Sequence, residues 1–261
     1  DDNKLGFRLG LVTASYAFGA VIFSVIFPIL FDNFGFENGY FLGLGTLLII
    51  VTIGLFLFIA SKVKIGTDTS ISQKIKPHKI KIFKLWLGYF LGVFAGLMTI
   101  AHAVPLISSF GGSAVIAITA ISLMSLGSGI ASVCTGWLVD RFGCKRPLVV
   151  ILIINSFAIL GLSIMTSIDL LFIMLILIAS LYGAIIAIYP TLINHLVGQD
   201  LSALVYGKVF TAWGAAGLAS PALAGWLFEI NNNYDVAILF ILTMSVIAIF
   251  IIWTMEYSNK N

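Results

Sequence analysis

Eight apolar runs, separated by short polar clusters, constrain this chain more than any other feature of its sequence. They lie at 9–31, 39–60, 83–107, 114–138, 147–166, 170–193, 204–228 and 236–255. As helices rising 1.5 Å per residue, they are long enough to cross a hydrocarbon core about 30 Å thick. Only helices satisfy their own backbone hydrogen bonds there without closing a barrel, and the period-2 alternation of membrane strands is absent. The runs predict an all-α membrane protein with eight transmembrane helices.

The charged residues support this count. Only 10% of the residues are charged, about half the fraction usual in a soluble domain. If the eight runs alternate across a membrane, all 14 Lys and Arg residues fall on one side, and the opposite loops hold only the acidic residues Asp32, Glu37, Asp169, Glu229 and Asp235. Because cytoplasmic loops collect Lys and Arg, we expect both termini to lie in the cytoplasm, in a plasma membrane such as the bacterial inner membrane. The net charge of +3 then reflects topology and gives no reason to expect nucleic acid as a partner.

The motifs of several enzyme classes are absent. The sequence holds no H-E-x-x-H, G-x-S-x-G, C-x-x-C or G-x-x-x-x-G-K-[ST] pattern, and no Asp, Glu, Lys or Arg occupies the middle of an apolar run. We therefore expect neither an enzyme nor an ATP-driven pump, and no cofactor or metal. Cys134 and Cys144 lie near the predicted cytoplasmic face, where the reducing environment favours two ordinary thiols.

The sharpest local pattern follows the fourth run. Residues 136–146 read Gly-Trp-Leu-Val-Asp-Arg-Phe-Gly-Cys-Lys-Arg. Gly136 allows close helix approach, Asp140 and Arg141 lie at the membrane edge where they can pair or face a helix terminus, and Gly143 permits a tight turn. We predict a conformational latch formed by Gly136, Asp140, Arg141, Gly143 and Arg146.

The spacing G-x-x-x-D-R-x-G-x-K-R resembles, in every fixed position, the cytoplasmic loop signature of the major facilitator superfamily. That family has twelve spans in two six-helix halves and carries the signature after its second and eighth spans. Four runs precede the signature here, so the resemblance implies that the chain matches spans five to twelve and that the family's first four spans are not in this sequence. The implied domains are the last two spans of the N-terminal half (1–61), the cytoplasmic central loop (62–82) and the complete six-helix C-terminal half (83–261).

Two further stretches resemble the oxalate/formate antiporter and monocarboxylate-transporter group of that family. They are Ala-His-Ala-Val-Pro at 101–105 and Tyr-Gly-Lys-Val-Phe-Thr-Ala-Trp-Gly at 206–214. The second stretch has Trp213 where oxalate carriers place a lysine, and the run 114–138 lacks the arginine that they use with it. Because a dianion desolvated without either cation is costly, the resemblance favours a small carboxylate and disfavours oxalate itself.

The depth of a residue in the membrane, counted along its run, indicates which side chains could contact a substrate. Trp213 lies about 13 Å into its run, Phe210 is one turn away, and Tyr182 is near the middle of 170–193. Ser125 and Ser128 are in the middle of 114–138. These aromatic rings and hydroxyls would suit a small, weakly charged or neutral organic molecule. The alternative for each is packing, because aromatics fill helix interfaces and serine bonds its own backbone.

His102 is the one side chain in the interior of a run that titrates near neutral pH. It lies about 8 Å from the outer end of 83–107, just before Pro105. It could form an outer gate or take up a proton. Alternatively, it has a structural role and donates a hydrogen bond to a carbonyl freed by Pro105.

Small residues recur at four-residue spacing on two runs. They are Gly88, Gly92 and Gly96 on one run, and Ala212, Ala216, Ser220 and Ala224 on the other. This spacing predicts close helix packing.

Together these patterns predict a secondary carrier that moves a small organic solute by alternating access, and they leave proton coupling, exchange with a counter-substrate and uniport open. The rival hypothesis is a truncated or split membrane protein that does not transport and needs a partner polypeptide, for example one supplying the missing N-terminal four spans. Four more in-frame spans in the upstream coding sequence would favour the carrier.

Overall fold

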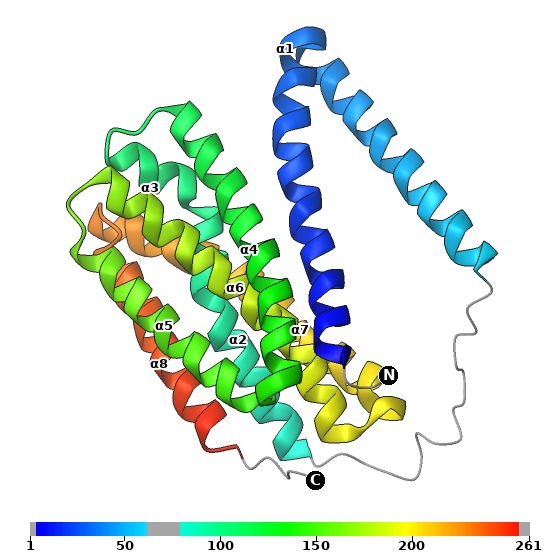
Figure 1. The fold of residues 1–261 in the computed structure, drawn as a ribbon. Coiled ribbons are helices and arrows are strands. Elements are labelled where there is room, and N and C mark those ends of the chain that lie inside the picture. The colour runs from blue at the N-terminus through cyan, green and yellow to red at the C-terminus, as the bar shows by residue number, and fades with distance from the viewer. Residues whose placement is uncertain (1–3, 62–78, 256–261) are drawn as a thin grey trace. The chain divides into compact units, whose positions relative to one another are not determined.

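The computed structural model describes residues 4–61 and 79–255, and the chain is helical throughout this part (Figure 1). The helices there are α1 (Leu5–Ala60), α2 (Lys79–Ala101), α3 (Ala103–Ser109), α4 (Ala114–Phe142), α5 (Lys145–Ile164), α6 (Ile168–Val197), α7 (Gln199–Asn231) and α8 (Asp235–Trp253). No strand occurs in the described ranges.

The helices follow the predicted runs. α1 covers the first two, α2 and α3 together cover the third, and α4 to α8 cover the other five. Among the described residues, six helices are long and apolar enough to cross a membrane, including α1, whose 56 residues have the length of two spans. The two helices that are not among these six are α3, which has only 7 residues, and α7, which is less apolar than the others. The predicted all-α membrane fold is confirmed.

The chain divides into two compact units, one of residues 1–18 with 77–261 and the other of residues 19–76. The first contains the start of α1 and all of α2 to α8, and the second contains the remainder of α1. The predicted central loop, 62–82, lies outside the described residues up to position 78. The division into transporter halves at that loop therefore stays a prediction.

Within the unit 19–76, α1 bends sharply at Gly35. The backbone there has φ 76° and ψ 164°, a conformation that glycine adopts without the strain a side chain would bring. The two arms touch near the bend, where a Cβ placed on Gly39 would lie 2.9 Å from the carbonyl carbon of Leu30. The turn expected between the first two runs is thus a single tight bend.

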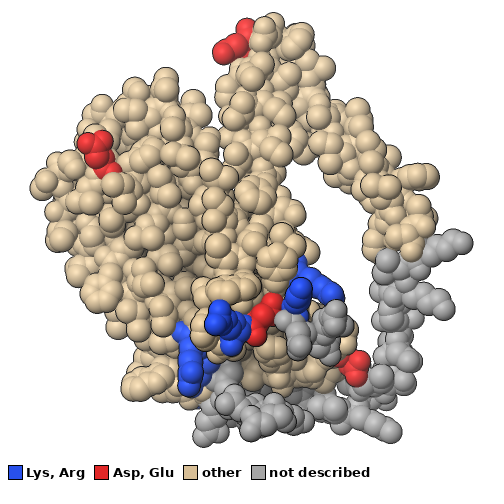
Figure 2. Space-filling model, in the orientation of Figure 1, with Lys and Arg blue, Asp and Glu red and all other residues tan. Residues whose placement is uncertain are grey.

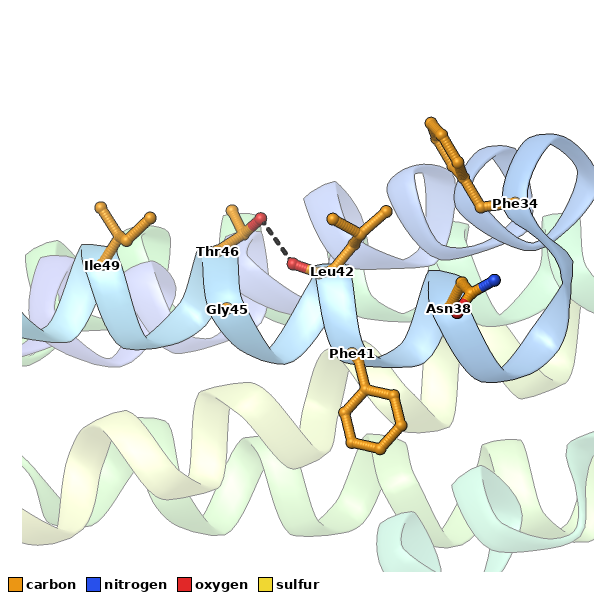
Figure 3. Close-up of a pocket in the computed structure, with 7 residues that line it drawn as sticks. All are labelled: Phe34, Asn38, Phe41, Leu42, Gly45, Thr46 and Ile49. Atoms are coloured by element: carbon orange, nitrogen blue, oxygen red, sulfur yellow. Dashed lines mark hydrogen bonds between the residues drawn. The ribbon is translucent and has the colours of Figure 1, made fainter.

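An open groove of about 590 Å³ runs along the second arm of α1 (Figure 3). Figure 3 shows Leu42, Thr46 and Ile49 on one side of the helix and Phe41 on the other. The Thr46 hydroxyl donates to the Leu42 carbonyl at 2.9 Å. The lining holds no charged side chain; it consists of Phe34, Asn38, Phe41, Leu42, Gly45, Thr46 and Ile49.

In the larger unit, helices pack as close neighbours: α2 with α7, α4 with α6, and α5 with α8. The predicted small-residue stripes also lie at helix contacts: the glycines of α2 face α6 and its neighbours, and the stripe on α7 faces α2. A Cβ on Gly96 of α2 would meet the ring of Tyr182 of α6, with Cγ at 2.6 Å. On α7, Ser220 is fully buried and donates to the carbonyl of Phe94 at 2.7 Å. The prediction of close packing at these stripes is confirmed.

Charge is divided between the two ends of this unit. The visible Lys and Arg side chains gather at the end of the unit where α4 ends and α5 begins, with a few acidic side chains among them (Figure 2); we call it the motif end. The other end of the unit carries acidic side chains where α6 begins, where α7 ends and where α8 begins: Asp169, Glu229 and Asp235, respectively. We call that end the histidine end, because the break between α2 and α3 places His102 there. The separation is the one expected from the sequence.

Candidate functional site

Asp140, in the last turn of α4, binds the beginning of α1. Its carboxylate accepts hydrogen bonds from the backbone N–H of Gly6 at 2.7 Å and of Phe7 at 2.8 Å. N–H groups in the first turn of a helix lack helical partners, and the helix dipole favours a negative charge there. Of the two placements open from the sequence, pairing with a cation or facing a helix terminus, Asp140 adopts the second.

Gly136 makes this contact sterically feasible. A Cβ on Gly136 would lie 2.9 Å from the carbonyl carbon of Gly6 and 3.0 Å from Cα of Phe7. One turn further along, a Cβ on Gly10 would lie 2.6 Å from the carbonyl oxygen of Ser132. The start of α1 therefore packs backbone to backbone on α4. Sequence reasoning missed the stripe of Gly6, Gly10 and the buried Ala14, although its four-residue spacing is the signal used elsewhere on the chain.

The other predicted latch residues take different positions. Gly143 ends α4 with φ 76°, and its N–H donates to Val139 at 2.9 Å. The Arg141 guanidinium lies over the rings of Trp137 and Phe142, at 5.6 and 5.5 Å from their centroids. Arg146 is exposed in the first turn of α5. The structure thus brings Gly136 and Asp140 together on α1, with Gly143 as the turn beside them.

Cys144, the residue after Gly143, is buried, with Sγ 3.4 Å from Nδ1 of His195. Burial raises the pKa of Cys144 to about 12, and the nearby Asp140 charge adds to the effect. The thiol therefore keeps its proton at neutral pH, and it shares this hydrogen bond with the imidazole. In the described ranges, no three His, Cys, Asp or Glu side chains cluster closely enough to hold a metal ion.

Replacing Gly136 by alanine is expected to lower the thermal stability of the purified protein. The added Cβ overlaps the backbone of Gly6 and Phe7, and such overpacking costs about 1–3 kcal/mol. Gly54→Ala is the matched control, because open space surrounds that glycine. A melting temperature for Gly136→Ala equal to that of the control would show that α1 does not pack on α4 in this way.

Three predicted substrate contacts meet at mid-helix. Trp213 Nε1 donates to the hydroxyl of Tyr182 at 2.7 Å. Phe210 stacks on Trp213, with ring centroids 5.4 Å apart and an interplanar angle of 8°. Tyr182 lies at the middle of α6 and is 6% exposed. Residues from α6 and α7 that the sequence could place only by depth are therefore in direct contact.

Further rings extend this aromatic cluster towards the motif end. Tyr206 contacts Phe210 with centroids 5.3 Å apart, and Tyr89 lies 6.3 Å from Phe210. Tyr89 also stacks on Tyr189 of α6 at 4.1 Å. Sequence reasoning missed all three tyrosines. The position of Tyr206 one turn before Phe210 could have revealed it, whereas Tyr89 and Tyr189 meet only through tertiary packing.

Of the two predicted serines, Ser128 lies beside the cluster, in the contact between α4 and α6. A Cβ on Gly183 would lie 2.8 Å from Cα of Ser128. Ser132 bridges the two helices, donating to the carbonyls of Ser128 at 2.8 Å and Gly183 at 3.0 Å. Ser128 thus adjoins Tyr182 through Gly183. Ser125 is half-buried one turn earlier on α4, and none of the described contacts joins it to the aromatic cluster.

Tyr16 is another residue that sequence reasoning missed as a site residue. It lies in the part of α1 that belongs to the larger unit, and its side chain is 69% exposed. It is close enough to Tyr182 to act on that hydroxyl electrostatically. No described hydrogen bond or ring contact joins Tyr16 to Tyr182.

His102 occupies the break between α2 and α3 and makes two hydrogen bonds. Nδ1 lies 3.0 Å from the hydroxyl of Tyr234, and Nε2 lies 3.1 Å from the carbonyl oxygen of Pro221 on α7. A hydrogen bond to a carbonyl was one of the expected roles. However, the acceptor belongs to another helix and is not a carbonyl freed by Pro105.

Comparison with known proteins gives two results. The family model of the Major Facilitator Superfamily matches residues 1–221 and, in a second overlapping match, residues 85–260. The chain is also similar to the oxalate:formate antiporter of Oxalobacter formigenes, with 24% identity over 254 residues. That alignment covers 94% of this chain and 60% of the antiporter, so the chain spans only part of that relative's length. The family match extends over most of the residues, and the chain belongs to the Major Facilitator Superfamily.

Proposed function

We propose that this chain forms part of a secondary carrier that moves a small monocarboxylate by alternating access. The observation that carries the proposal is the hydrogen bond from Trp213 to Tyr182 at mid-helix. An indole N–H can only donate, so the Tyr182 oxygen is the acceptor and its own proton is left for another acceptor. A hydroxyl that accepts one hydrogen bond is a stronger donor in the next. Tyr182 can therefore donate to a carboxylate oxygen.

The charge of the surroundings limits what can bind there. The described hydrogen bond and ring contacts that join Tyr89, Tyr182, Tyr206, Phe210 and Trp213 involve no Lys or Arg side chain. A hydroxyl can offset part of the desolvation of one negative charge, but a second charge would stay unpaired in an apolar setting. The Oxalobacter relative is named for oxalate and formate. Formate has one charge and fits this site better than oxalate, which has two.

The contact between Asp140 and the start of α1 would act as the latch of the transport cycle. It joins α1, which the family resemblance assigns to the N-terminal half, to α4 of the C-terminal half. Breaking and remaking this contact would accompany each change of access, with the motif end facing the cytoplasm. His102 would act at the outer end, as a gate or as a proton-binding group. Either a proton or a counter-substrate would complete the cycle.

Uptake by proteoliposomes containing the complete gene product tests this proposal. The panel comprises formate, acetate, lactate, oxalate, a sugar and a neutral amino acid, each measured with and without a pH gradient and with internal counter-substrate. Monocarboxylates are expected to enter at least about tenfold faster than oxalate, the equivalent of about 1.4 kcal/mol. Faster uptake of oxalate, or uptake of only the sugar or the amino acid, would contradict the assigned substrate class. If nothing enters, the non-transporting alternative gains support.

A further inference from the structure

His102 is placed at a natural hinge. α2 ends at Ala101 and α3 begins at Ala103, and His102 between them has φ −104° and ψ 13°. Its backbone still continues the hydrogen-bond chain, to Met98 at 2.9 Å and from Leu106 at 2.9 Å. Pro105 has no N–H to offer to the carbonyl four residues earlier, which weakens the helix at this point. A side chain at such a break can couple a local chemical change to helix movement.

The two partners of His102 fix its hydrogen-bond polarity. The Pro221 carbonyl can only accept, so Nε2 carries a proton. In the neutral imidazole Nδ1 is then an acceptor, and the Tyr234 hydroxyl must donate to it. Burial raises the pKa of Tyr234, so this hydroxyl keeps its proton. The neutral histidine is thus fully satisfied, with one bond to α7 and one to the segment before α8.

We propose that His102, Tyr234 and the Pro221 carbonyl form a proton-responsive joint, in which proton uptake by His102 reverses its hydrogen bond with Tyr234. A proton from the aqueous phase binds the Nδ1 lone pair, giving an imidazolium that donates from both nitrogens. The Tyr234 oxygen becomes the acceptor. Its own O–H, which had donated to Nδ1, turns to another acceptor such as water. The link between this proton-responsive joint and transport rests on the function proposed above.

The setting of Tyr234 makes this reversal a structural event. Its side chain is only 8% exposed, and its ring packs on Phe228 of α7 with centroids 4.6 Å apart. It follows Asn232, which ends α7 in the left-handed conformation with φ 55°. A hydroxyl that turns away from Nδ1 inside this packed turn needs a new partner. The α7–α8 turn must therefore admit water or shift, which would loosen it from the α2–α3 break.

The acidic side chains at the histidine end do not take the place of Tyr234 as the hydrogen-bond partner of His102. Glu229 lies near the end of α7, Asp235 begins α8, and Asp169 is in the first turn of α6. All three are exposed. Among the described contacts of the imidazole, Tyr234 provides the one titratable partner. Tyr234 is therefore the positioning residue for the proton on His102.

The test measures the pH midpoint of the histidine signal in Tyr234→Phe, by nitrogen NMR of the complete protein labelled at histidine in detergent. Subtraction of the spectrum of His102→Gln assigns the signal among the three histidines. Phenylalanine keeps the ring packing but removes the acceptor of the protonated form, whose charge-assisted bond is the stronger one. We expect the midpoint to fall by about one pH unit. Tyr40→Phe removes an exposed hydroxyl of α1 and should leave it unchanged.

The midpoint of the pH profile for uptake should move in the same direction in Tyr234→Phe, and His102→Gln should flatten that profile between about pH 5 and pH 8. An NMR midpoint that is the same in Tyr234→Phe and wild type would overturn the joint, as would a His102 signal that does not titrate. An NMR shift without any carboxylate uptake would support the joint and contradict the proposed function. A failure of the proton-responsive joint can thus be distinguished from a failure of the proposed transport function.

Discussion

Asp140→Asn is expected to slow transport by at least about tenfold while leaving membrane insertion intact. The carboxylate holds two backbone N–H groups at the positive end of α1. An asparagine oxygen can replace one of these bonds but not the charge, and hydrogen bonds to charged groups contribute about 1.5–3 kcal/mol. Since each 1.4 kcal/mol is a factor of ten, the conformation closed by this contact would lose roughly 10- to 100-fold in population.

Initial uptake rates and surface expression, measured in parallel, check this prediction. Asp169→Asn is the matched control, because that exposed carboxylate lies in the first turn of α6 at the histidine end. It should transport at the wild-type rate. Wild-type uptake by Asp140→Asn would remove the latch role from this contact.

Trp213→Ala is expected to weaken substrate affinity by roughly 10- to 100-fold. The change removes the indole N–H that polarises Tyr182, worth about 1 kcal/mol. It also removes the ring stacked on Phe210, worth about 0.5–1.5 kcal/mol. Trp213→Phe keeps a ring and loses only the N–H, so its affinity should fall about fivefold.

The half-saturating concentration of the best monocarboxylate from the uptake panel is the quantity to measure. Trp226→Ala is the control, because that tryptophan lies on the same helix with 57% of its side chain exposed. Its affinity should match the wild type. Unaltered affinity in Trp213→Ala would place substrate elsewhere, and an equal loss in Trp213→Ala and Trp213→Phe would assign the whole effect to the hydrogen bond.

The helices were predictable from the sequence because membrane spans are determined locally. Hydropathy, length and the distribution of Lys and Arg located all eight runs, although three details differ. The predicted span 83–107 is broken at His102, where Pro105 interrupts the hydrogen bonding, and α7 extends to both sides of 204–228. A loop was expected between the runs 9–31 and 39–60, but the chain there is helical on both sides of a single bend at Gly35.

The sites were only partly predictable, because their partners come from distant positions. Depth along each helix brought Trp213, Phe210 and Tyr182 to one level, and the structure places them in contact. Tyr234 is 132 residues from His102, and Gly6 is 134 residues from Asp140. The pairing of the helices depends on how stripes of small residues pack against neighbouring helices. From one sequence alone, each such stripe is compatible with several neighbouring helices, so the pairing could not be predicted.

The orientation of the chain in the bilayer underlies both the latch and the depth of the aromatic cluster, and side-specific cysteine labelling tests it most directly. Single cysteines replace the exposed Arg146 at the motif end and the exposed Asn233 at the histidine end, with Cys134 and Cys144 removed. A membrane-impermeant maleimide applied to intact cells should label Asn233→Cys, and Arg146→Cys should react only after permeabilisation. Labelling of Arg146→Cys from outside would contradict the proposed orientation.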